Sequence, residues 1–124
     1  MTSPEILNLI GRLCVAGYFL WSVPFNLGAR GHHLAEFRRI GVPGGPVLFA
    51  GGIALSLVGS VLLLYTPTAM IGALMLILFT LTADALFHRF WTYADPHEAV
   101  IHKFFLIEHI ALCGGILGLA AATL

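Results

Sequence analysis

The stretch from Pro46 to Phe90, PVLFAGGIALSLVGSVLLLYTPTAMIGALMLILFTLTADALFHRF, decides the fold. It contains two apolar runs, 46–65 and 69–90, and each is as long as the roughly 20 residues that a helix needs to cross the hydrocarbon core of a membrane. Only Tyr65-Thr66-Pro67-Thr68 separates them, and a proline in such a turn ends one helix and can open the next. The stretch therefore predicts two spanning helices joined as a tight antiparallel hairpin.

Two further apolar runs flank this hairpin, at about 6–25 and 104–123. Hydrophobic residues make up 59% of the chain and charged residues only 10%, whereas soluble domains carry about 25% charged residues. These features predict an all-α integral membrane protein, a four-helix up-and-down bundle that forms one domain over residues 1–124. Because the formal net charge is zero, nothing points to nucleic acid as a partner.

The connections predict how the bundle crosses the membrane. Residues 26–45 and 91–103 are polar, and we expect a short surface helix over 32–40 and a helix start at Asp95-Pro96. Five basic residues flank these two connections: Arg30, Arg38, Arg39, Arg89 and Lys103. Positive charge favours the cytoplasmic side, so we expect both termini outside. The first apolar run starts almost at Met1 without a basic head, and we therefore expect no removable signal peptide.

Ionisable side chains inside the apolar runs are the first candidates for function, because each costs roughly 3 kcal/mol at the membrane centre. They are Arg12, Asp84, His88, Glu108 and His109. With a rise of about 1.5 Å per residue, Asp84 and Glu108 lie roughly 9 Å and 6 Å deep from the same side. We expect the last four to form one polar layer near the cytoplasmic ends of the third and fourth spans. Arg12 enters from the opposite side, and its long side chain is a candidate bridge to Asp84.

Several interpretations of this layer stay open. Its members can hydrogen-bond one another and set the helix register. Alternatively, they bind the head of a quinone or another amphipathic molecule, or they form part of a small transporter or proton path. His88 and His109 are suitable ligands for haem or a metal ion, but no ligand-spaced sequence motif supports this, so no metal site is predicted.

Other residues have simpler expected roles. Trp21, Trp91 and Tyr93 lie near span ends and are predicted to be interface anchors. Cys14 and Cys113 lie at similar depths, which allows a redox pair, although two separate core residues are the simpler interpretation. Glycines in the second and fourth spans predict close helix contacts, within one chain or between copies: Gly51, Gly52, Gly59, Gly114, Gly115 and Gly118.

Two segments resemble a known family. Phe87-His88-Arg89-Phe90-Trp91 is similar to the His-x-Phe-Trp segment that closes the third helix of DoxX-type membrane proteins, and Phe105 to Gly115 is similar to the apolar stretch before a Gly-Gly pair in their fourth helix. Glu108-His109 replaces the Lys-Asn of that stretch. The resemblance implies a four-helix protein of the bacterial inner membrane.

The resemblance also implies a role beside quinone- or sulfur-linked oxidoreductases. We therefore expect a small accessory subunit of a membrane redox assembly, with other membrane subunits or further copies of itself as partners. We expect no catalytic activity of its own. A quinone is the cofactor that the polar layer would suit.

Overall fold

The computed structural model describes residues 1–124, and it is helical throughout with no strand. This confirms the predicted all-α class. Four of its helices are long and apolar enough to cross a membrane, and the remaining one is short and polar. The helices are α1 (Ser3–Gly28), α2 (Arg30–Arg39), α3 (Gly45–Leu64), α4 (Ala69–Phe87) and α5 (Pro96–Ala121), with single 3-10 turns η1 (Thr66–Thr68) and η2 (Phe90–Thr92). The chain is thus a multi-pass helical membrane protein.

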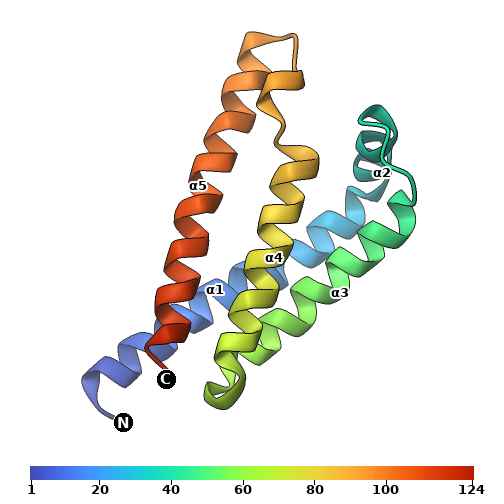
Figure 1. Ribbon diagram of the computed structural model, residues 1–124. Helices are drawn as coiled ribbons and strands as arrows, with labels where there is room; N and C mark the ends of the chain where they lie inside the picture. The colour runs from blue at the N-terminus through green and yellow to red at the C-terminus, as the bar shows by residue number, and fades with distance from the viewer.

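The long helices alternate in direction (Figure 1). Both termini lie at one end of the molecule together with the turn η1, and α2 and the connection between α4 and α5 lie at the other end. We call these the terminal end and the connection end. The helix α3 packs on both α1 and α4, and α5 packs mainly on α4.

The α3–α4 hairpin is tight because glycine lets the two backbones approach. A Cβ placed on Gly72 would collide with the backbone of Leu63 and would lie 2.6 Å from the carbonyl oxygen of Gly59. Gly59 itself faces the side chains of Met75 and Leu76. The predicted close contact of the second span therefore holds at Gly59, and its counterpart on α4 is Gly72.

The fully buried hydrophobic core contains residues from all four long helices: Phe19, Leu63, Ala73, Leu76, Ile116 and Ala120. Many large apolar side chains remain exposed on the outside, as expected of a surface that faces lipid. A Cβ placed on Gly114, Gly115 or Gly118 of α5 would meet no neighbour within 4 Å. The close contacts expected of the fourth-span glycines are therefore absent within the chain, because α5 buries only the face that meets α4 and α1.

Helix boundaries differ from the predicted spans mainly at the end of α4. The third span was predicted to run to residue 90, but α4 ends at Phe87 and His88 is its C-cap. The guanidinium of Arg89 donates to the carbonyl of Ala85, which supplies a partner that a further turn of helix would have provided. As predicted, Asp95 caps α5, where its side chain accepts from the backbone N–H of His97, and Pro96 occupies the first turn.

Candidate functional site

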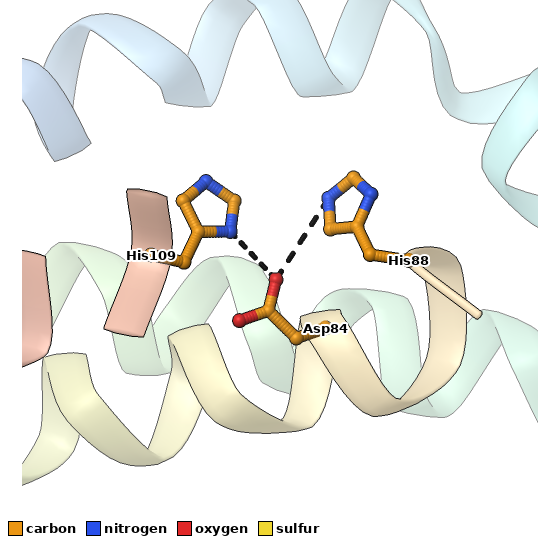
Figure 2. A group of neighbouring side chains, drawn as sticks. All are labelled: Asp84, His88 and His109. Carbon is orange, nitrogen blue, oxygen red and sulfur yellow. Dashed lines mark hydrogen bonds and ion pairs between the residues drawn. The ribbon is translucent and has the colours of Figure 1, made fainter. Parts of the chain in front are cut away.

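A cluster of three ionisable side chains lies between α4 and α5 toward the connection end (Figure 2). Asp84 on α4 faces His109 on α5, and Oδ1 of Asp84 lies 2.6 Å from Nδ1 of His109. His88 follows Asp84 by one helical turn, and its Nε2 lies 3.9 Å from the same carboxylate oxygen. The structure thus brings together three of the four residues predicted to form the polar layer.

Glu108 is the predicted member that does not join the cluster. It precedes His109 by one residue, and consecutive side chains on a helix point about 100° apart. With His109 turned toward Asp84, Glu108 is exposed on the outer surface of α5 and its carboxylate takes part in no hydrogen bond. The expectation that Glu108 belongs to the layer is therefore wrong.

His102 joins the cluster, although it falls in the polar connection 91–103, where a histidine four residues after Glu98 is typical of a solvated pair. Its Nδ1 lies 3.0 Å from Nδ1 of His88, and its ring stacks on that of Tyr93 at a centroid distance of 4.1 Å. The spacing of seven residues from His102 to His109 brings both side chains to nearly the same face of α5, within about 20°. That spacing is the feature of the sequence that indicates a second histidine of α5 at the site.

Aromatic and polar side chains hold these rings in place. Phe105 lies against both His88 and His109, with ring centroids 5.1 Å and 6.2 Å away. Tyr93 contacts His102 on one side and the guanidinium of Arg39 on another. Tyr93 was predicted to anchor the chain at the interface, but it packs inside the connection end instead, while Trp21 and Trp91 are exposed as expected of anchors.

One atom of the cluster lacks a partner. Asp84 is only 3% exposed, and its Oδ2 is buried without a hydrogen bond, whereas Oδ1 has two imidazoles close by. The other unpartnered buried atom is the hydroxyl of Ser56, which carries no charge. A carboxylate oxygen that is removed from water without a partner is costly, so Asp84 calls for a proton, a cation or a donating ligand.

A cavity of about 940 Å³ adjoins the cluster. It lies between the connection-end halves of the long helices and is lined by 31 residues, of which 18 are hydrophobic. His88, His102 and His109 form a polar part of the wall. Trp21 and Phe25 line it from α1 and are 80% and 74% exposed, so that side of the cavity is open to the surroundings of the protein.

Two polar residues that line the cavity at the connection end, His33 and Tyr93, are shifted toward their uncharged forms. Burial lowers the pKa of the His33 imidazole, and the neighbouring His32 lowers it further. Burial also raises the pKa of the Tyr93 hydroxyl, and the carboxylate of Glu36 acts in the same direction. Both groups line the cavity, where they offer hydrogen bonds without a net charge.

Arg12 lies apart from the cluster, at the terminal end, and does not bridge to Asp84. Its guanidinium donates to the carbonyls of Leu63 and Leu64, each at 3.0 Å, and to the hydroxyl of Thr66 at 3.1 Å. Its Nε donates to Asn8, whose amide donates in turn to the carbonyl of Leu119 on α5. Arg12 therefore caps the C-terminal end of α3, where helical carbonyls have no partner of their own and the helix dipole favours a cation.

The two cysteines are free thiols in different surroundings. Cys14 is exposed on α1, and Cys113 is buried on α5. Cys113 follows His109 by four residues and so shares its inward face, while Cys14 points away from the core. The structure places them as two separate residues and does not bring them together as a redox pair.

No family model, curated protein or solved structure matches the chain. The class of the protein therefore rests on its own features: a four-span helical membrane bundle with a buried Asp–His cluster beside a large, mainly apolar cavity.

Proposed function

We propose that this protein binds an amphipathic, membrane-soluble molecule with a quinone-type head group. The cavity beside the Asp84–His88–His109 cluster is the observation that carries the proposal. Its volume of about 940 Å³ is near the upper end of the roughly 300–1,000 Å³ typical of ligand pockets. A wall that is mostly apolar with a few convergent polar groups is also typical of such pockets.

The lining suits a ligand that arrives from the lipid. Trp21 and Phe25 line the cavity on α1 and remain largely exposed, while the only hydrogen bond between α1 and α5 lies at the terminal end, from Asn8 to Leu119. The connection-end halves of these two helices thus leave a lateral way in. An apolar tail would lie against the aromatic and aliphatic wall and could extend between the helices into lipid.

The cluster suits the head group. An imidazole N–H of His88 or His109, which line the cavity, can donate to a quinone carbonyl, and an unprotonated imidazole nitrogen of either can accept from a quinol hydroxyl. Reduction of a quinone to a quinol takes up two electrons and two protons. The histidines and Asp84 supply sites for the protons, and a partner oxidoreductase in the membrane supplies the electrons.

We therefore propose a DoxX-like role as an accessory subunit of a membrane redox assembly, in the bacterial inner membrane. The resemblance of Phe87 to Trp91 to the DoxX-type segment supports this placement. In this proposal the connection end faces the cytoplasm and both termini face outward, because the basic residues Arg30, Arg38, Arg39 and Arg89 all lie at the connection end.

The test fills the cavity without touching the cluster. Gly51 lines the cavity, and a Cβ at this position meets nothing within 4 Å, so Gly51→Phe should fold and occupy ligand space. Gly17 is equally open but does not line the cavity, and Gly17→Phe is the matched control. We expect decylubiquinone, measured by equilibrium binding to the detergent-solubilised protein, to bind the wild type and Gly17→Phe but at least tenfold more weakly to Gly51→Phe. Absence of binding to the wild type, or equal binding to all three proteins, would refute the proposal.

A further inference from the structure

The Asp–His cluster has the ligand set of a metal centre. One carboxylate and two imidazoles, from Asp84, His88 and His109, offer ligand atoms that all lie within 4.8 Å of one another (Figure 2). Imidazole nitrogen and carboxylate oxygen together suit first-row divalent ions such as Zn²⁺. Two helices contribute the ligands. Asp84 lies on α4 and His88 is the C-cap of that helix, while His109 lies on α5.

The unpartnered oxygen of Asp84 points independently to a cation. Asp84 is 3% exposed, and no lysine or arginine forms an ion pair with it. The buried guanidinium of Arg12 is engaged at the terminal end with the carbonyls of α3. A divalent ion bound through Oδ1 would neutralise the carboxylate and so offset the cost of burying Oδ2, which has no hydrogen-bond partner.

The neighbours of His88 hold its ring as the outer partners of metal-binding histidines do. Nδ1 of His88 lies 3.0 Å from Nδ1 of His102, which leaves Nε2 directed to Asp84. Nε2 of His102 lies 3.8 Å from a carboxylate oxygen of Glu98, and the ring of Tyr93 stacks on His102. Such a chain from carboxylate to histidine to ligand sets the tautomer and the orientation of the ligating ring.

The distances allow an ion after small adjustments. In a tetrahedral site with bonds of 2.0–2.1 Å, neighbouring ligand atoms lie about 3.3 Å apart. Oδ1 of Asp84 and Nδ1 of His109, now at 2.6 Å, would separate by about 0.7 Å, and Nε2 of His88, now at 3.9 Å from Oδ1, would approach by about 0.6 Å. His88 can move this far because it follows the last residue of α4 and lies outside the regular helix.

We propose that Asp84, His88 and His109 bind one divalent first-row transition-metal ion, with His102 positioning His88. Three protein ligands leave a fourth position, and because His88 and His109 line the cavity, that position faces the cavity. The metal site depends on the Asp–His cluster and not on quinone binding, so the protein can have either site without the other.

The test uses Zn²⁺ and Co²⁺ with the full chain in detergent, after chelator treatment and re-addition of metal. We expect one Zn²⁺ per chain by elemental analysis, and a visible Co²⁺ absorption spectrum of low-coordinate nitrogen and oxygen ligation. Asp84→Asn and His109→Gln should each weaken binding on the order of 100-fold or more, since loss of an outer partner alone costs about 10- to 100-fold. His97→Gln is the control, because His97 is an exposed histidine at the same end of the molecule.

Positioning by His102 has its own readout. His102→Phe keeps a ring to stack on Tyr93 but removes the nitrogen that meets His88. We expect about tenfold weaker Zn²⁺ binding, a shifted Co²⁺ spectrum and an unchanged helix content by circular dichroism. An unchanged affinity and spectrum in this variant would remove His102 from the proposal.

Two results would overturn the metal site. One is a wild-type chain that binds less than one Zn²⁺ under these conditions, and the other is binding that survives in both Asp84→Asn and His109→Gln. The cavity-filling variant Gly51→Phe separates this site from the proposed quinone site, because it should lose decylubiquinone and still bind Zn²⁺. If the wild type binds Zn²⁺ but not decylubiquinone, the quinone site is refuted and the metal site is supported.

Discussion

Arg12 and Asp84 are the two charged side chains buried in the bundle, at 5% and 3% exposure, and they differ in how far their neighbours satisfy them. The guanidinium of Arg12 meets acceptors from three other residues of α3 and η1 and from Asn8 of its own helix. Asp84 meets only imidazoles, through one oxygen, and its other oxygen has no partner. The core residue Leu63 accepts from Arg12 through its carbonyl, whereas His88 and His109, the neighbours of Asp84, line the cavity.

The difference separates two uses of a buried charge. A buried group whose hydrogen bonds are all made stabilises the fold, and at the terminal end this group ties α1 to α3 and, through Asn8, to α5. A buried group that remains partly unsatisfied lowers stability. Such groups are typical of functional sites, where a ligand makes the missing contact. The terminal end therefore has the features of a structural contact, and the connection end is where the proposed binding sites lie.

Removing Arg12 should have the largest effect on stability. Arg12→Met leaves the buried carbonyl of Leu63 and the part-buried carbonyl of Leu64 without their donor, at about 1–3 kcal/mol for a buried unsatisfied group. We expect the free energy of unfolding in mild detergent to fall by about 3 kcal/mol. Arg30→Met, at an exposed arginine, should stay within about 0.5 kcal/mol of the wild type. Similar stability of both variants would show that the Arg12 contacts are not what holds the terminal end together.

A methyl group at Gly72 should be the next most harmful change. Its Cβ would press on the backbone of Leu63, and overpacking of this kind costs roughly 1–3 kcal/mol. Gly114→Ala is the matched control, because Gly114 has open space around it and alanine raises helix propensity by up to about 1 kcal/mol. Thermal unfolding should therefore move down for Gly72→Ala and not for Gly114→Ala. A stable Gly72→Ala protein would mean that the hairpin is looser than its contacts indicate.

Changes at the connection end should matter least for stability and most for binding. The double variant Asp84→Asn with His109→Gln replaces both partners of the Asp84–His109 contact by neutral hydrogen-bonding side chains, and removal of both partners of a pair is often nearly neutral. We expect its free energy of unfolding to change by less than about 1 kcal/mol while Zn²⁺ binding is lost. A loss of stability as large as that of Arg12→Met would instead assign the cluster a structural role.

Most of the candidate residues of the site could be predicted from the sequence, but which of them come together could not. Asp84, His88 and His109 stand out in sequence because charged and histidine side chains are rare inside apolar runs. Glu108 stands out for the same reason, yet it lies outside the cluster, whereas His102 belongs to the cluster but does not stand out, because it falls in a polar segment. Which of these faces Asp84 depends on the rotation of α5 about its own axis, and contacts with α4 determine that rotation.

The cavity has a similar origin. Its wall comes from all four long helices and from α2, and no local pattern records how far α1 and α5 diverge at the connection end. The role of Arg12 could not be predicted either. Its partners are mainly backbone carbonyls at the end of α3, and every residue has a backbone carbonyl, so the sequence does not mark those that Arg12 meets.

By itself the sequence determined that four apolar helices cross a membrane, where the α3–α4 hairpin turns and where Asp95 and Pro96 start the last helix. Length, hydropathy and the chemistry of proline and capping residues are local, and local properties are readable along a chain. Only the tertiary structure decided which buried charge is satisfied, which histidines converge and where space is left, because those outcomes depend on the angles at which whole helices meet.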